Sequence, residues 1–205
     1  GVNDLDLTVN AVNCAANKKG NEELCKLLET LSANPVNNNI VIGIFDRDVD
    51  QKVKDENGNQ VTLKGQEYAN LGNNTYAFIL PVPHDRKQED QISIEHFFTD
   101  EEIKTSNENG QRLFIGNEFN KAGNHKTDNY NYRYIGDLFN TIKIIEHETR
   151  KHVTDKNGDG DYSLSKMRFA EAVKDDRQGF DTFDFSEFNK IFDVIRKIVT
   201  EARGD

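Results

Sequence analysis

The sequence feature that most constrains the fold is a continuous apolar run that ends in two aspartates. The run spans residues 40–45, and Asp46-Arg47-Asp48 follows it directly. A short apolar run between polar segments is typical of a strand that is buried on both faces, as in a parallel sheet. The run therefore predicts a central strand whose carboxyl end is marked by acidic side chains.

The segments around this run predict an α/β arrangement. Residues 5–12 alternate between apolar and polar side chains, as a strand with one buried face does, and leucines recur at helical spacing over residues 24–31. A second apolar run at residues 76–82 predicts another buried strand. Strand, helix and buried strand in this order indicate a βαβ unit, so we expect a mainly parallel sheet flanked by helices.

The chain has the length and the apolar content of a single domain. Its 205 residues are 35% hydrophobic and include 13 phenylalanines and 6 tyrosines, whose large rings can fill one core. We expect residues 1–205 to form one domain, in which residues 99–140 are an irregular insertion because they carry few periodic signals. Apolar residues at helical spacing predict a C-terminal helix over residues 184–203.

Charge and cysteine content exclude several classes of function. The net charge of −10 repels phosphate, so binding of nucleic acid is a poor hypothesis unless metal ions or a partner domain contribute. No window approaches the roughly 20 apolar residues of a membrane span, and the first residues show no signal-peptide pattern. Two cysteines are too few for a disulfide framework or a zinc site, so we expect a cytoplasmic protein.

The two aspartates after the apolar run are candidates for binding a divalent metal ion. Residues two apart in a strand point to the same side, so Asp46 and Asp48 would present their carboxylates together while Arg47 points away. In an open α/β sheet this carboxyl edge is also where ligands bind. The alternative is that the aspartates only end the strand in a solvated turn.

A glutamate further along the chain is surrounded by apolar residues. Glu95 lies within residues 92–98, where an ionised carboxylate is costly unless it is paired or bound to metal. The alternative for Glu95 is a place at the start of a helix, on the rim of the core. His96 is another potential ligand, although an exposed or hydrogen-bonded histidine is the simpler interpretation.

The order of these motifs resembles the TOPRIM domain of bacterial nucleases of the OLD (overcoming lysogenization defect) type. In that family a hydrophobic strand ends in an Asp-x-Asp metal motif, a later segment supplies another carboxylate, and a lysine opens a helix rich in small and apolar residues. Asp46 and Asp48 match the first motif, and Glu95 matches the later glutamate. Lys166 is the loosest match, to the lysine.

The resemblance implies a TOPRIM-like fold over about residues 5–175 and metal-assisted hydrolysis of phosphodiester bonds. In that reaction Mg²⁺ or Mn²⁺ held by Asp46, Asp48 and Glu95 would orient the phosphate and activate water. Lys166 would stabilise the developing negative charge. The alternative interpretation of Lys166 is an ordinary exposed lysine in the first turn of a helix. OLD-like proteins also carry an ATPase domain, which is expected as a partner because the sequence has no Gly-x-x-x-x-Gly-Lys-Ser/Thr loop.

One part of the family pattern is missing at the N-terminus. TOPRIM domains open with a strand that ends in a metal-binding glutamate, whereas residues 5–12 correspond to the second strand of that order. We therefore expect the chain to begin after the first catalytic strand. By itself it should be a poor or inactive nuclease, because a site that lacks one ligand holds its metal less firmly.

A second acidic segment is similar to a calcium-binding loop. Residues 155–161 supply the acidic and amide side chains of an EF-hand loop at its first, third and fifth positions and a glycine at its sixth. The twelfth position, which should be a glutamate, is Lys166. The same Asn-Gly-Asp-Gly residues favour a hairpin turn without any metal, so we expect a turn that does not depend on calcium.

Three hypotheses for function remain open. The first is a metal-dependent nuclease-type domain that is incomplete in this chain, and the second is a non-catalytic protein-interaction or regulatory domain with the same fold. The third is a calcium-binding module formed by residues 155–161. Titration with divalent metals separates them, because only the first predicts Mg²⁺ or Mn²⁺ at Asp46 and Asp48 and only the third predicts Ca²⁺ at Asp155.

Overall fold

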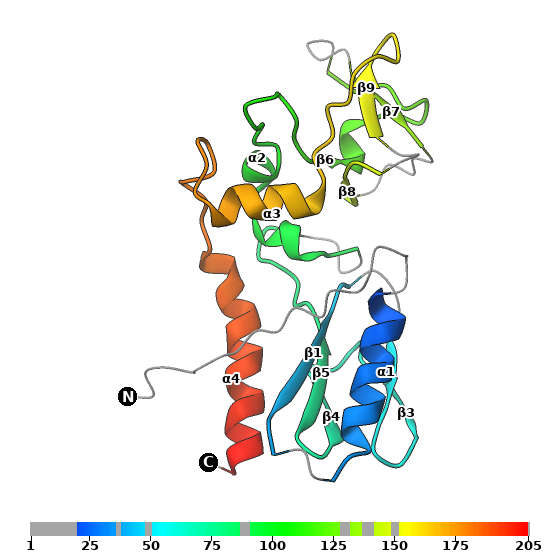
Figure 1. The fold of residues 1–205 in the computed structure, drawn as a ribbon, viewed down its shortest axis with the longest axis vertical. Coiled ribbons are helices and arrows are strands. Elements are labelled where there is room, and N and C mark those ends of the chain that lie inside the picture. The colour runs from blue at the N-terminus through cyan, green and yellow to red at the C-terminus, as the bar shows by residue number, and fades with distance from the viewer. Residues whose placement is uncertain are drawn as a thin grey trace. The chain divides into compact units, whose positions relative to one another are not determined.

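The computed structural model describes most of the chain as a mixed α/β structure with four α-helices and several small sheets (Figure 1). The expected α/β class is confirmed at this level. The strand expected at residues 5–12 lies outside the described residues, as does Asp48. The described residues are 20–35, 38–47, 51–86, 91–127, 132–136, 142–148 and 152–204.

Short elements alternate along the chain. The α-helices are α1 (Gly20–Ser32), α2 (Asp100–Ile103), α3 (Lys166–Lys174) and α4 (Asn189–Arg203). The 3₁₀ helices are η1 (Ile94–Phe97), η2 (Gly116–Glu118) and η3 (Ser186–Phe188). The strands are β1 (Val41–Phe45), β2 (Lys52–Lys54), β3 (Gln60–Thr62), β4 (Ala69–Gly72), β5 (Thr75–Ile79), β6 (Phe114–Ile115), β7 (Tyr132–Ile135), β8 (Ile144–Ile145) and β9 (His152–Asp155).

The described residues divide into two compact units that interleave along the chain. The first unit contains the residues up to Phe45, those from 51 to Ile79 and those from Val194 onward. The second contains Asp46 and Arg47 together with the described residues of Leu80–Asp193. The chain therefore enters the second unit immediately after β1 and again immediately after β5. The expectation of one domain over residues 1–205 stays a prediction.

The main sheet of the first unit has the strand order β1-β5-β4. Strands β1 and β5 are parallel, whereas β4 and β5 are antiparallel. Asn73 and Asn74 join β4 to β5 with positive φ angles of 45° and 57°, which suit the tight turn of an antiparallel hairpin. The mainly parallel sheet that we expected is not confirmed, because among the described strand pairs only β1–β5 is parallel.

Helix α1 packs closely on β1 in the first unit. Leu28 is fully buried, and a side-chain carbon at Gly43 would collide with it. Glycine at this position therefore lets the helix approach the strand. The expected burial of residues 40–45 on both faces is wrong for Ile44, which is 39% exposed. Successive side chains of a strand point to opposite faces, so Ile44 lies on the face of β1 opposite to Gly43, which packs against Leu28 of α1.

Helix α4 contributes its C-terminal half to the first unit, where it and α1 flank the sheet on opposite sides (Figure 1). The hydroxyl of Tyr68 and the amide of Asn70 donate hydrogen bonds to Glu201 of this helix. The expected C-terminal helix is thus present, although α4 begins at Asn189 and the 3₁₀ helix η3 precedes it. The region expected as an irregular insertion contains α2, β6, η2 and β7.

Aromatic side chains form the core of the second unit. One cluster surrounds Phe98 between η1 and α3, and a second lies against the small sheets β6–β8 and β7–β9. The rings of the first are Phe98, Phe169, Phe180, Phe183, Phe185 and Phe188, and those of the second are Phe114, Phe119, Tyr132, Tyr134 and Tyr162. Such rings bury large apolar areas on short elements, which explains how this unit can have a core with little regular structure.

Four turns in the described part of the chain share one hydrogen-bond pattern. In each, an Asp or Asn side chain accepts hydrogen bonds from the backbone amides two and four residues later, and a glycine with positive φ occupies the fourth position. Glycine adopts this conformation without strain, so the pattern Asp/Asn-x-x-Gly specifies the turn. The turns are 55–59, 107–111, 120–124 and 155–159.

Candidate functional site

A buried ion pair joins two of the residues that the sequence singled out. Lys166, the first residue of α3, places its Nζ 2.9 Å from Oε2 of Glu95 in η1. The Glu95 side chain is only 8% exposed, and the hydroxyl of Ser93 donates a hydrogen bond to the same oxygen at 2.6 Å. One carboxylate oxygen of Glu95 is therefore shared by an ammonium group and a hydroxyl group.

A backbone bridge positions Asp46 next to the segment that carries Glu95. Arg47 pairs with Ile92 in an antiparallel bridge, in which the Arg47 amide donates to the Ile92 carbonyl at 2.7 Å. The Arg47 guanidinium also donates through Nε to the carbonyl of Leu80, directly after β5, at 2.7 Å. These contacts fix the residues that follow β1 beside the chain that leads into η1.

Three of the four predicted site residues come together in the second unit. The charges of Asp46 and Glu95 both act on the Lys166 ammonium group. Asp48, the fourth predicted residue, lies outside the described residues. That its carboxylate points to the same side of the strand as that of Asp46 stays a prediction. The Lys166 ammonium therefore contacts Glu95 of η1 and is close enough to Asp46 to respond to its charge.

A further carboxylate, which the sequence analysis did not single out, lies beside the start of α3. Glu146 directly follows β8, and its Oε2 accepts a hydrogen bond from the backbone amide of Lys166 at 3.0 Å. The signal that could have found Glu146 is the one that found Asp46, an acidic residue directly after an apolar strand. We refer to Asp46, Glu95, Glu146 and Lys166 as the Lys166 cluster.

The charges of the Lys166 cluster shift the pKa values of its two central members. Burial alone would lower the pKa of Lys166, but Glu95, Asp46 and Glu146 raise it above its ordinary value of 10.5. Burial alone would raise the pKa of Glu95, but the ammonium of Lys166 and the hydroxyl of Ser93 hold it below its ordinary value of 4.5. The central pair is therefore ionised at neutral pH.

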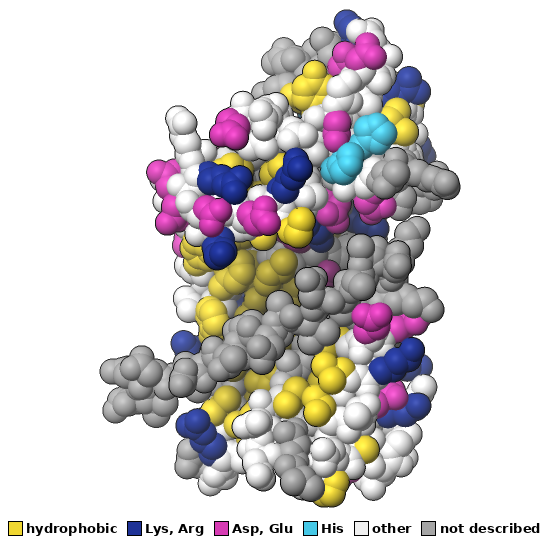
Figure 2. Space-filling view, in the orientation of Figure 1, with side chains coloured by type: hydrophobic (Ala, Val, Ile, Leu, Met, Phe, Trp, Pro, Cys, Tyr) yellow, Lys and Arg dark blue, Asp and Glu magenta, His cyan; other side chains and the backbone are white. Residues whose placement is uncertain are grey.

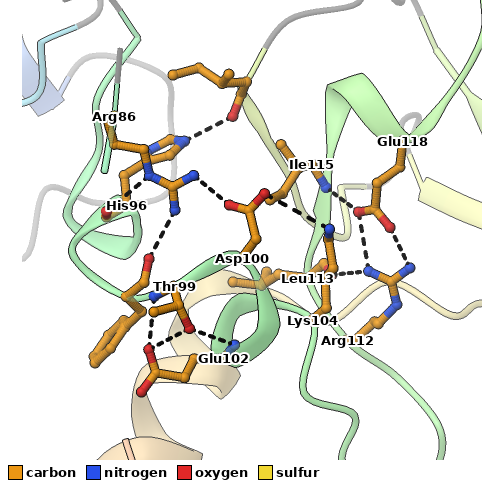
Figure 3. Close-up of polar contacts among 12 residues, drawn as sticks. Arg86, His96, Thr99, Asp100, Glu102, Lys104, Arg112, Leu113, Ile115 and Glu118 are labelled. Carbon is orange, nitrogen blue, oxygen red and sulfur yellow. Dashed lines mark hydrogen bonds and ion pairs between the residues drawn. The ribbon is translucent and has the colours of Figure 1, made fainter. Parts of the chain in front are cut away.

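His96 links η1 to the chain that leads into β8. Its Nδ1 accepts a hydrogen bond from the Ser93 amide at 3.0 Å. Its Nε2 donates to the carbonyl of Ile142 at 2.8 Å (Figure 3). A neutral ring with its proton on Nε2 satisfies both contacts. Burial lowers the pKa of His96, which keeps the ring in this form. The hydrogen-bonded interpretation of this histidine therefore fits the structure.

Arg86 fixes the end of η1. Its guanidinium donates to the carbonyls of His96 at 3.3 Å and Phe98 at 2.9 Å, and it forms an ion pair with Asp100 (Figure 3). The last carbonyl groups of a helix need such outside donors because no amide within the helix reaches them. Arg86 and His96 together hold the backbone on both sides of Glu95.

The Lys166 cluster offers the donor atoms of a site for a hard divalent cation. Carboxylate oxygens are the ligands that Mg²⁺ and Mn²⁺ prefer in proteins, so the chemistry of the cluster fits the expected metals. Its described side chains are nevertheless not arranged as a closed metal site, because no group of three His, Cys, Asp or Glu residues within the described ranges could hold an ion. Lys166 supplies the positive charge among these carboxylates.

No similar protein indicates what this chain does, so its function is inferred from the site alone. No family model, no curated protein and no solved structure matches this chain. No helix in the described ranges is long and apolar enough to cross a membrane.

A second buried network of charged groups supports the small sheets of the second unit. Arg112 binds both carboxylate oxygens of Glu118, at 3.2 Å and 2.7 Å (Figure 3). The Ile115 amide donates to the same carboxylate at 2.7 Å, and Nε2 of His125 lies 3.1 Å from it. Burial alone would raise the pKa of Glu118, but Arg112 holds it below its ordinary value. These contacts engage both oxygens of Glu118, so we assign the network a structural role.

In the segment similar to an EF-hand loop, the acidic side chains of Asp155 and Asp161 contact other groups of the protein. Oδ1 of Asp155 accepts hydrogen bonds from the amides of Asn157 at 2.8 Å and Asp159 at 2.9 Å. Oδ2 of Asp161 lies 2.5 Å from Nδ1 of His147. The turns at 107–111 and 120–124 have the same hydrogen bonds with a neutral asparagine in place of Asp155. The same turn thus forms with a neutral side chain at this position, and its independence of calcium stays a prediction.

A polar cavity of about 620 Å³ lies in the first unit. It is bounded by the chain after α1 and by the turns at 55–57 and 70–74, and its walls consist largely of asparagine side chains with Asp55 and Glu56. None of the predicted site residues lines it. The candidate site is therefore the Lys166 cluster.

Proposed function

We propose that the Lys166 cluster is the centre of a metal-dependent site for phosphodiester hydrolysis in a TOPRIM-like domain of the OLD type. The observation that carries the proposal is the meeting of Asp46, Glu95 and Lys166 from three separate elements. These residues were chosen from the sequence for their order and for the chemistry of their side chains.

Each residue has a distinct role in the proposed reaction. Asp46, Asp48 and Glu95 hold Mg²⁺ or Mn²⁺, and Ser93 orients Glu95 through the hydrogen bond to Oε2. A divalent ion, when bound, neutralises phosphate charge and lowers the pKa of a water molecule. Lys166 supplies a positive charge for the phosphate oxygens in the transition state.

Electrostatics indicate how nucleic acid would be bound. The chain has a net charge of −10, and Figure 2 shows acidic and basic side chains interspersed on one face of the molecule. The described part of that face therefore carries no continuous basic patch. Affinity for DNA would come from bound cations and from a partner such as an ATPase domain.

Cleavage assays with matched variants test the proposal. Plasmid and single-stranded DNA are incubated with the chain and Mn²⁺. Asp46→Asn and Glu95→Gln should each reduce cleavage by about 100-fold or more. The controls are Asp181→Asn and Glu171→Gln, which change exposed side chains of the second unit and should leave cleavage unchanged. Cleavage that survives both site variants would contradict the proposal.

One observation favours the second hypothesis, a non-catalytic interaction or regulatory domain. The ion pair between Glu95 and Lys166 is complete without a metal ion, as expected if the cluster only holds η1 and α3 together. Under this hypothesis Asp46→Asn leaves the affinity for Mn²⁺ unchanged. Calorimetric titration of Mn²⁺ into the wild-type chain and this variant separates the two hypotheses.

A further inference from the structure

The polar cavity of the first unit has the dimensions of a binding site. Its volume of about 620 Å³ lies within the range of about 300–1,000 Å³ that small-molecule sites occupy in proteins. No member of the Lys166 cluster lines it. Binding in this cavity is therefore independent of the proposed hydrolysis.

Hydrogen bonds join the walls of the cavity to one another. The Glu56 amide donates to the Leu71 carbonyl at 2.8 Å, which ties the turn at 55–59 to β4. The side-chain amide of Asn73 donates to the Ser32 carbonyl at 2.5 Å, which ties the turn between β4 and β5 to the end of α1. The cavity is therefore formed without a ligand, as small-molecule sites usually are.

Several side chains of the walls keep their hydrogen-bonding capacity for a ligand. Within the described ranges, the side chains of Asn38, Glu56 and Asn57 make no hydrogen bond or ion pair. The Glu56 carboxylate lies against Gly72, where a side-chain carbon would come within 2.3 Å of it. Glycine at this position thus leaves room for a carboxylate in the wall of the cavity.

Tyr76 adds a buried hydroxyl group to the lining residues. The residue is only 3% exposed, and its hydroxyl makes no hydrogen bond to another described residue. Burial raises the pKa of Tyr76, so the hydroxyl keeps its proton and can donate a hydrogen bond. A polar group that has lost contact with water gains free energy when it acquires a partner.

The charge of the walls disfavours ionic ligands. Among the described residues the cavity is lined by no lysine or arginine, so phosphates and carboxylates are repelled by Asp55 and Glu56. Both carboxylate oxygens of Asp55 already accept hydrogen bonds from Asn57 and Asn59. Glu56 is exposed, and a single exposed carboxylate binds a cation weakly. Electrostatics therefore favour a neutral ligand.

We propose that this cavity binds a small neutral sugar. Amide side chains both donate and accept hydrogen bonds, as the hydroxyl groups of a sugar do, and the Glu56 carboxylate accepts them. The asparagines that line the cavity are Asn38, Asn57, Asn70, Asn73 and Asn74. Neutral hydrogen bonds replace similar bonds to water and stabilise a complex only modestly, so we expect a dissociation constant of about 1 mM.

NMR titration of the ¹⁵N-labelled chain tests the proposal. The probes are glucose, galactose and N-acetylglucosamine, each added well above the expected dissociation constant. At least one of them should shift the backbone amide resonances of the turns at 55–59 and 70–74 in a saturable way. Inorganic phosphate, the anionic probe, should leave these resonances in place. Absence of a saturable shift with all three sugars would overturn the proposal.

Matched variants locate the bound sugar. Asn57→Ala and Glu56→Ala should each weaken binding about fivefold or more, because each removes hydrogen bonds to the ligand. The controls are Asn109→Ala and Glu108→Ala, which change the equivalent positions of the turn at 107–111 outside the cavity. The control variants should bind as the wild type does. Equal weakening by both pairs, or by neither, would contradict binding in this cavity.

A cationic probe separates the sugar from the alternative ligand class. Methylammonium should not compete with the sugar, because the proposal assigns binding to hydrogen bonds of neutral groups. Methylammonium that shifts the same resonances more strongly than any of the sugars would overturn the proposal in favour of a cation held by Glu56. Every arm is read from the wild-type chain, so the proposal stays testable if a variant fails to fold.

Discussion

Lys166 and Glu95 form a 2.9 Å ion pair that links the start of α3 to η1. Asp46 at the end of β1 and Glu146 after β8 add their charges to the same ammonium group. One lysine therefore connects four segments of the second unit, and its substitution should affect both stability and metal binding.

The first prediction concerns stability. Lys166→Met leaves the Glu95 carboxylate buried without its cation and should lower the free energy of unfolding by about 3 kcal/mol. Lys174→Met, in the exposed last turn of α3, should change it by less than about 0.5 kcal/mol. Urea denaturation in the presence of EDTA measures both. The double variant Lys166→Met/Glu95→Gln should recover part of the loss, and a strictly additive loss would argue against the pair.

The pH dependence of this pair follows from the shifted pKa values. The folded-state pKa of Glu95 is below the ordinary value of 4.5, so its stabilising contribution is present above pH 4.5 and is lost as the pH falls through the folded-state value. The folded-state pKa of Lys166 is raised, so its contribution is lost only as the pH rises above 10.5. The stability difference between the wild type and Glu95→Gln should be constant near neutral pH and shrink in acid. A difference that persists unchanged to about pH 3 would contradict this assignment.

Local sequence signals were sufficient to find two members of the Lys166 cluster, Asp46 and Glu95. Asp46 follows a long apolar run, and Glu95 stands out as an acidic residue among apolar neighbours. Lys166 was found only through the resemblance to a family pattern. Glu146 was missed, although it directly follows the apolar residues of β8 as Asp46 follows those of β1.

Contacts between distant segments could not be read from the sequence. The parallel pairing of β5 with β1 fits the two apolar runs, whereas β4, which the tight turn at Asn73 and Asn74 makes antiparallel to β5, was not expected. The strands β7 and β9 have only four residues each and pair across a long stretch of chain. Their stability depends on the aromatic cluster of the second unit, which exists only after folding.

The third prediction concerns the network around Glu118. Glu118→Gln replaces a carboxylate that binds Arg112 with both oxygens. The buried guanidinium of Arg112 would then lack a negative charge to compensate it. We expect the free energy of unfolding to fall by about 3 kcal/mol. Glu108→Gln, at an exposed position in the same unit, serves as the control in the same denaturation experiment. Equal stability of the two variants would show that the network contributes little.

The fourth prediction concerns the turn at 155–159. Asp155→Ala removes the two hydrogen bonds that the side chain accepts and should cost about 1 kcal/mol of stability. Asn107→Ala removes the equivalent hydrogen bonds of the turn at 107–111 and should cost a similar amount. Thermal unfolding in Ca²⁺ and in EDTA should give the same loss for Asp155→Ala. Stabilisation of the wild type by Ca²⁺ that disappears in Asp155→Ala would favour the calcium-binding hypothesis.

The most direct test of the metal site is anomalous X-ray scattering from crystals of the chain saturated with Mn²⁺. The account predicts an anomalous peak within coordination distance of the Asp46 and Glu95 carboxylates. It would be contradicted by a saturated crystal in which the anomalous peak lies elsewhere or is absent.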